Sequence, residues 1–123
     1  MKNLLLVFIG GGLGSSLRYL IGKSLNNHTT TFPWGTFIAN LLGCLLIGII
    51  LGWSLQKAKL SESYVLLLAT GFCGGFTTFS AFSNESLNLL KTGETITFGF
   101  YVLGSIVLGL GLVWLGYQLV KIN

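Results

Sequence analysis

The chain has 123 residues, of which 52% are hydrophobic and only 8% are charged. A soluble domain carries about 25% charged residues because its surface faces water, so the composition excludes a soluble domain and predicts a protein embedded in the lipid bilayer. The net charge is +4, but the seven basic residues are scattered rather than clustered on one element, so nucleic acid is not expected as a partner.

A helix crosses a membrane with about 20 mostly apolar residues, and four such helices account for the chain as a single all-α domain over residues 1–123. We predict transmembrane helices over residues 3–22, 34–54, 64–90 and 97–120. The start of the first helix also resembles a signal peptide, because Lys2 precedes an apolar stretch. A convincing small-residue cleavage site is missing, however, and the apolar pattern continues past Arg18.

The third predicted helix has an unusual centre, GFCGGFTTFSAF, from Gly71 to Phe82. Glycine costs a helix about 1 kcal/mol per residue, and threonine hydroxyls compete for backbone partners. In lipid, backbone groups that a helix releases must be satisfied by protein, water or an ion. We therefore predict a break over residues 74–78, near mid-membrane, of the kind that forms ion sites in transporters. A close-packed glycine contact is the alternative interpretation.

Glycines recur four residues apart within the predicted helices. In an apolar helix this spacing brings two backbones close together. The chain contains three such pairs: Gly10/Gly14, Gly48/Gly52 and Gly71/Gly75.

Basic residues are nearly balanced across the predicted membrane. Four spans place both termini and the loop before residue 64 on one side. That side holds Lys2, Lys57, Lys59 and Lys121, and the other side holds Arg18, Lys23 and Lys91. Orientation normally follows an excess of Lys and Arg on the cytoplasmic side, so near-balance predicts insertion in both orientations. Such a chain can pair with itself as an antiparallel homodimer, although a balance by chance is the alternative.

Polar and aromatic side chains inside the predicted helices favour an anion pathway. Neutral hydroxyl and amide donors, together with the positive edges of aromatic rings, form the weak multiple sites through which an ion can pass. Catalysis is not expected, because the chain has no Asp and only Glu85 lies within a predicted span, so an acid–base pair is missing. The pathway candidates are Thr36, Asn40, Phe79, Ser80, Phe82, Tyr101 and Ser105.

Three motifs resemble those of the Fluc fluoride channel family, also called CrcB. They are GGGLGSSLRY (Gly10–Tyr19), WGTFIANLLGCLLIG (Trp34–Gly48) and GFCGGFTTFSAF (Gly71–Phe82). The resemblance implies an antiparallel, dual-topology homodimer with two pores in the bacterial cytoplasmic (inner) membrane. It also implies a passive, fluoride-selective channel that exports fluoride from the cytoplasm and thereby gives resistance to it.

The resemblance also implies roles for individual residues. Asn40, Phe79 and Phe82 match the pore residues, and Ser80, Tyr101 and Ser105 match polar positions along the pathway. Arg18 matches the basic residue near an aqueous vestibule, and Glu85 matches an acidic or polar position without a defined role. Gly74 and Thr77 match positions whose backbone carbonyls, two from each subunit, hold a central structural Na⁺. One departure is Ala81, where many members have threonine.

Two other functions fit a small four-helix membrane protein. A proton-coupled multidrug exporter requires a membrane-embedded carboxylate in the first helix, and residues 3–22 contain none. A structural subunit that packs through its glycines would leave the predicted break and the pore-suited donors without a purpose.

Overall fold

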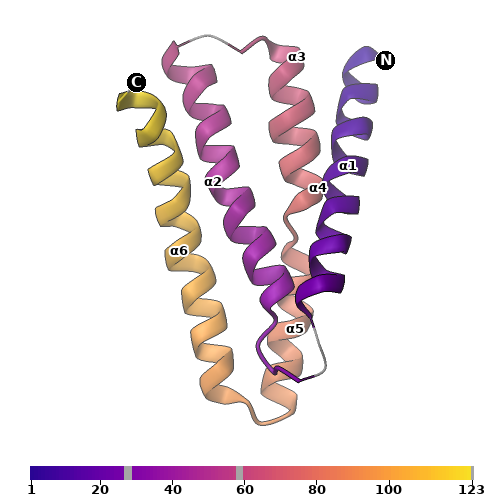
Figure 1. Ribbon diagram of the computed structural model, residues 1–123, viewed down its shortest axis with the longest axis vertical. Helices are drawn as coiled ribbons and strands as arrows, with labels where there is room; N and C mark the ends of the chain where they lie inside the picture. The colour runs from indigo at the N-terminus through magenta and orange to yellow at the C-terminus, as the bar shows by residue number, and fades with distance from the viewer. Residues whose placement is uncertain (27–28, 58–59, 123) are drawn as a thin grey trace.

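The computed structural model describes residues 1–26, 29–57 and 60–122, and these residues form a bundle of long helices (Figure 1). Four helical segments are long and apolar enough to cross a membrane: Lys2–Leu25, Trp34–Gln56, Glu62–Lys91 and Thr95–Ile122. Each includes a predicted span and extends beyond it by a few residues at one or both ends. The regular structure of these described residues is therefore entirely helical, and the chain is a multi-pass membrane protein.

The first two spans and the last span are single helices, α1 (Lys2–Leu25), α2 (Trp34–Lys57) and α6 (Thr95–Ile122). Both termini and the α2–α3 connection lie at one end of the bundle, and the other two connections lie at the opposite end (Figure 1). Four successive spans produce this arrangement. Lys59, which contributes to the predicted charge balance, lies outside the described residues.

The third span is built from four pieces. It begins with α3 (Glu62–Val65), continues as a π-helical segment η1 (Leu66–Cys73) and the short α4 (Gly74–Phe76), and ends with α5 (Phe79–Lys91). Between α4 and α5, Thr77 (φ −87°, ψ 158°) and Thr78 (φ −151°, ψ 120°) are extended. These two residues lie within the range over which the sequence predicts a break.

Glycines bring α1 into contact with the third span. A Cβ atom on Gly10 would overlap the carbonyl oxygen of Leu67, and one on Gly14 would overlap that of Phe72. Gly75 in turn lies against the backbone of Gly11. The predicted close contacts are therefore confirmed here, and they occur in the same span as the extended pair.

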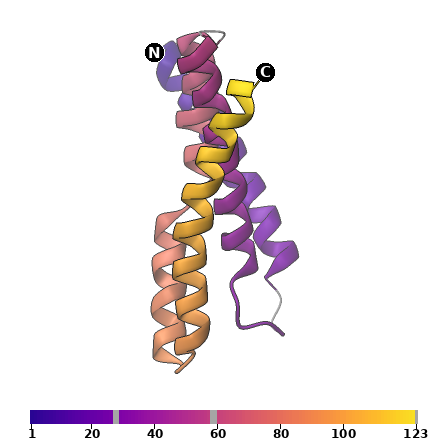
Figure 2. The ribbon, with the colours of Figure 1, turned by 90° about the vertical axis from the view of Figure 1, so that its left-hand side faces the viewer.

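A second glycine contact joins α2 to α6, which pack along much of their length (Figure 2). A Cβ atom on Gly48 would overlap the carbonyl oxygen of Val113, and one on Gly116 would overlap that of Leu45. The bundle thus consists of two glycine-packed pairs, α1 with the third span and α2 with α6. Side chains between these pairs form the site described next.

Candidate functional site

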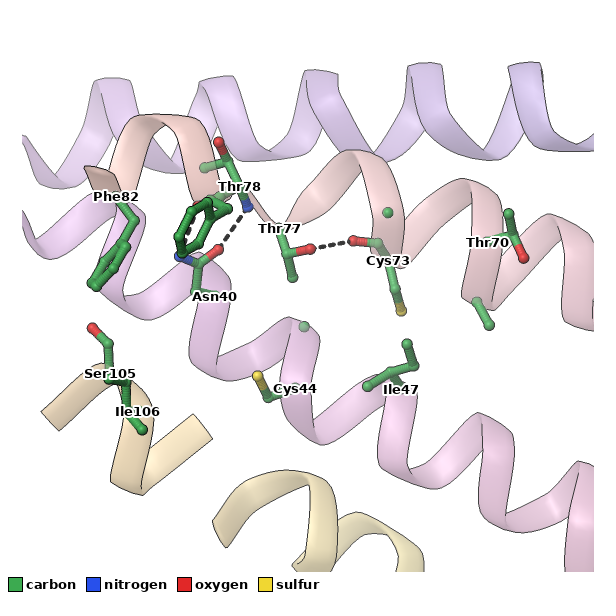
Figure 3. Close-up of a pocket in the computed structure, with 14 residues that line it drawn as sticks. Asn40, Cys44, Ile47, Thr70, Cys73, Thr77, Thr78, Phe82, Ser105 and Ile106 are labelled. Carbon is green, nitrogen blue, oxygen red and sulfur yellow. Dashed lines mark hydrogen bonds between the residues drawn. The ribbon is translucent and has the colours of Figure 1, made fainter. Parts of the chain in front are cut away.

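A cavity of about 510 Å³ lies where α2, the extended pair and α6 approach one another (Figure 3). Residues from both sides of the extended pair line it, together with residues of the neighbouring helices. Six of the residues predicted from the sequence are among them: Asn40, Gly74, Thr77, Phe79, Phe82 and Ser105. The fold therefore gathers most of the predicted site around one cavity.

Asn40 of α2 binds both backbone groups of Thr78. Its amide nitrogen donates to the Thr78 carbonyl oxygen at 3.1 Å, and its Oδ1 accepts from the Thr78 N–H at 2.8 Å (Figure 3). In a continuous α-helix the N–H of Thr78 would instead donate to the carbonyl of Gly74. A side chain from another helix thus satisfies the backbone where the third span is not helical. The second hydrogen on the Asn40 amide nitrogen adds donor capacity at the cavity.

The extended pair also changes the partners of two backbone carbonyls. Because the Thr78 N–H binds Asn40, the Gly74 carbonyl loses its helical donor. The Thr77 carbonyl loses its helical donor too, because the Ala81 N–H donates to Thr78 Oγ1 at 3.2 Å as a helix cap. Gly74 and Thr77 are the residues for which the resemblance implies Na⁺ ligands. Carbonyl oxygens at a helix break are suited to coordinate Na⁺, so these residues fit that ion.

Three aromatic rings lead from the open side of the cavity toward the interior. Phe79 is 80% exposed, whereas Tyr101 is completely buried. The ring centroids of Phe79 and Phe82 are 5.8 Å apart, and those of Phe82 and Tyr101 are 5.2 Å apart. Phe79 and Phe82 lie three residues apart on α5 and therefore share a face. Tyr101 comes from α6 and does not line the cavity itself.

Glu85 accepts hydrogen bonds at the inner end of this aromatic series. The Tyr101 hydroxyl donates to Oε2 at 2.7 Å, and the Thr36 hydroxyl donates to Oε1 at 2.7 Å. The sequence left the role of Glu85 undefined and identified Thr36 only as one of several polar residues. The useful signal was that Glu85 is the only carboxylate inside a predicted span, because an ionisable side chain within the membrane requires partners.

The two predicted serines have different surroundings. Ser105 Oγ is buried at the cavity and has no hydrogen-bond partner among the described residues, so its hydroxyl can donate to a ligand. Ser80 is exposed, and its Oγ lies 3.2 Å from Thr78 Oγ1. Ser80 does not line the cavity.

Arg18 lies beside the third span and outside the cavity lining. Its Nε donates to the carbonyl oxygen of Gly75 at 3.1 Å, and Ser15 Oγ donates to the same oxygen at 3.4 Å. These contacts tie α1 to the last turn before the extended pair. They also satisfy this Gly75 oxygen, which lies near the end of α4, where backbone carbonyls have no donor within the helix.

Comparison with known proteins adds to this geometry. Residues 5–117 match the family model described as "CrcB-like protein, Camphor Resistance (CrcB)". A fluoride-specific ion channel FluC from Phocaeicola vulgatus is 53% identical over 117 residues, covering 94% of this chain and 96% of the relative. Proteins of the same name from Flavobacterium psychrophilum and Oceanobacillus iheyensis are 43% and 44% identical, covering 98% and 97% of this chain and 98% and 92% of the relatives. These relatives are named as channels rather than enzymes. The chain belongs to the CrcB family.

Proposed function

We propose that this chain is a single-domain, fluoride-selective passive channel in the bacterial cytoplasmic (inner) membrane. The observation that carries the choice of ion is similarity over nearly the whole chain to relatives named as fluoride-specific ion channels. Hydrogen fluoride crosses membranes and dissociates in the cytoplasm. The channel then lets the trapped anion leave down its electrochemical gradient, which lowers internal fluoride and gives resistance.

The chemistry of the cavity supports passage of a small anion. Ser105 supplies a hydroxyl and Asn40 supplies an amide hydrogen, so neutral donors can replace part of the ion's hydration shell. The rings of Phe79 and Phe82 present positive edges. Neutral donors and ring edges bind an anion weakly enough to release it, which conduction requires.

The open cavity supports assembly as an antiparallel, dual-topology homodimer. The cavity contains a polar group that lipid cannot satisfy, the Ser105 hydroxyl, which has no hydrogen-bond partner among the described residues. A second copy covering this side would enclose the pathway, and two copies would provide two pores. The balance of four basic residues against three allows both orientations in the membrane.

A Na⁺ ion between the two copies would complete the site as a structural cofactor. The carbonyl oxygens of Gly74 and Thr77 have lost their helical donors, and two copies would contribute four such oxygens. Oxygen atoms are the ligands that hard cations prefer. The ion would hold the subunits together at the predicted mid-membrane break without taking part in conduction.

Fluoride efflux from liposomes tests the proposed function. The purified protein is reconstituted with a K⁺ ionophore, and chloride efflux is measured in parallel. Rapid fluoride release without chloride release is the expected result. If a folded dimer releases no fluoride, the channel proposal is wrong and a structural role for the subunit takes its place.

A further inference from the structure

Two cysteines line the cavity at the extended pair from opposite sides. The chain contains only two cysteines, Cys44 and Cys73, and neither forms a disulfide. Cys44 belongs to α2 and is half-buried, whereas Cys73 is the last residue of η1 and is buried. Figure 3 shows both sulfur atoms pointing into the space between α2 and the third span. The proposed conduction of fluoride uses neither thiol.

Contacts on either side of the two cysteines fix how α2 and the third span face each other. A Cβ atom on Gly43 would overlap the side chain of Thr77. One turn further along α2, Ile47 packs against the buried cluster that contains Cys73. The two segments are antiparallel (Figure 1), so residue numbers fall along the third span as they rise along α2. Cys44 therefore lies between these two contacts, opposite the turn from Cys73 to Thr77.

The surroundings of the thiols are largely apolar. The Cys44 sulfur reaches α6, where it would lie 3.4 Å from a Cβ atom on Gly109. Ile47, Ala69 and Ile106 line the same cavity. Burying an unpaired charge is costly, so these surroundings favour a ligand that forms a complex without net charge.

The donor set limits the kind of ion that the cavity could hold. A structural zinc ion takes four ligands, and within the described part of the chain no group of three or more His, Cys, Asp or Glu could hold a metal. Thiolates select soft metal ions, and some of these prefer two ligands in a line. A divalent ion bound by two thiolates is neutral, which suits an apolar cavity.

We propose that Cys44 and Cys73 form a two-thiolate site for a soft divalent cation, with Hg²⁺ as the representative ion. Each thiol loses its proton and forms one bond from sulfur to the metal. When the ion arrives as mercuric chloride, two protons and two chloride ions leave to the buffer. A disulfide requires sulfur atoms about 2 Å apart, whereas a bridging ion lets them remain further apart.

An ion at this site would lie beside the extended pair. The carbonyl oxygen of Cys73 accepts hydrogen bonds from the Thr77 N–H at 2.9 Å and from the Thr77 hydroxyl at 2.8 Å. Asn40, which binds Thr78, lies about one turn before Cys44 on α2. Bound Hg²⁺ would therefore obstruct fluoride in this cavity. This consequence, unlike the site itself, rests on the proposed channel function.

Retention of the metal measures whether both thiols hold it. Purified protein in detergent receives one equivalent of Hg²⁺ as mercuric chloride, is challenged with increasing 2-mercaptoethanol and is desalted. Elemental mass spectrometry then counts the Hg²⁺ that remains on each chain. Cys44→Ser and Cys73→Ser each leave one thiol. The matched control combines Leu42→Cys with Cys44→Ala, which keeps two thiols but moves one to an exposed position outside the cavity lining.

The wild type should hold Hg²⁺ more firmly than all three variants. We expect it to need at least about tenfold more 2-mercaptoethanol to lose half of its Hg²⁺, because the second thiol binds intramolecularly at a high effective concentration. If the wild type loses the ion as readily as Cys44→Ser does, the two thiols act separately and the site is wrong. This comparison is sufficient even if Cys73→Ser does not fold, since Cys73 is only 2% exposed.

Fluoride efflux from liposomes tests the consequence for conduction. The wild type loaded with Hg²⁺ should lose most of its fluoride efflux, and excess 2-mercaptoethanol should restore it. The double variant Cys44→Ser/Cys73→Ser, treated with Hg²⁺, should match its own untreated sample. Hg²⁺ retained without slower efflux would overturn the obstruction and leave the two-thiolate site in place. Absence of efflux from the untreated wild type would overturn the channel function, whereas the metal measurement would still stand.

Discussion

At the scale of single residues, Asn40 has a structural task that its predicted role in the pore does not include. Its side chain occupies both the donor and the acceptor group of the Thr78 backbone. A partly buried amide that binds backbone groups outside a helix is costly to remove, because the backbone groups it leaves behind lose their partners. The same residue lines the cavity, so one side chain would serve both stability and the proposed conduction.

Replacing Asn40 should therefore lower stability as well as flux. We expect Asn40→Leu, which keeps a similar size but removes both hydrogen bonds, to cost about 1–3 kcal/mol for each backbone group left unpaired. Thermal unfolding in detergent and liposome efflux measure the two effects. Asn84→Leu, at an exposed position on α5, is the control. Unchanged thermal stability of Asn40→Leu would show that the Thr78 contacts are not needed.

A substitution at Phe82 can distinguish the contribution of the aromatic ring edge to fluoride flux from that of an apolar side chain. Phe82→Ile keeps an apolar side chain at the cavity but removes the ring that approaches Tyr101. We expect a loss of fluoride flux of roughly tenfold or more with an intact dimer, since an aromatic contact contributes up to about 1.5 kcal/mol. The control is Phe100→Ile on the exposed side of α6. If Phe82→Ile conducts like the wild type, Phe82 does not belong to the pore.

At the scale of elements, the third span shows what sequence could and could not predict. The paired glycines and threonines of Gly71–Phe82 weaken a helix locally, so the sequence alone predicted an interruption over residues 74–78, and the extended pair lies there. The π-helical turns of η1 were not predicted, because no local residue pattern distinguishes them from an α-helix. The partnership of Asn40 with Thr78 was also missed, since it joins residues 38 positions apart.

For the candidate site too, the sequence revealed individual residues but not the contacts between them. Side chains with suitable chemistry inside a span could be identified individually, and four of them, Asn40, Phe79, Phe82 and Ser105, line one cavity. The hydrogen bonds of Glu85 with Thr36 and Tyr101 depend on how α2, α5 and α6 pack. Such contacts between elements are set by tertiary structure, so periodicity and composition do not reveal them.

The glycine contacts of α1 can be tested by single methyl groups. Gly10→Ala and Gly14→Ala would drive a Cβ atom into the backbone of η1, whereas Gly12→Ala would meet no atom of the described residues within 4 Å. Overpacking costs about 1–3 kcal/mol, so we expect Gly10→Ala and Gly14→Ala to lower the unfolding temperature. Gly12→Ala should be neutral or stabilising, because alanine is the better helix former. Equal effects at the three positions would rule out close packing of α1 as the cause.

At the scale of the whole molecule, Gly74 links the helix interruption to the proposed dimer. Within the described part of the chain, a Cβ atom at Gly74 would have no neighbour within 4 Å. The backbone there is α-helical, with φ −62° and ψ −37°, so alanine is allowed. A single chain gives no reason for glycine at this position, and helix propensity would favour alanine by about 1 kcal/mol. A second copy that brings its own Gly74 close would provide that reason.

Gly74→Ala should therefore leave the fold of a single chain unchanged but weaken the dimer. We expect the added methyl groups to crowd the proposed interface, lower the dimer fraction and reduce its dependence on Na⁺, because an ion that binds only the dimer stabilises it in proportion to the logarithm of its concentration. Light scattering during size-exclusion chromatography, in Na⁺ and in a bulky organic cation, measures both effects. Gly111→Ala on α6 is the matched control, since its Cβ would also lie in open space among the described residues. If both variants dimerise like the wild type with the same Na⁺ dependence, Gly74 lies away from the interface and the four-carbonyl Na⁺ site is wrong. A defect confined to Gly74→Ala must come from a partner, because the chain itself has room for the methyl group.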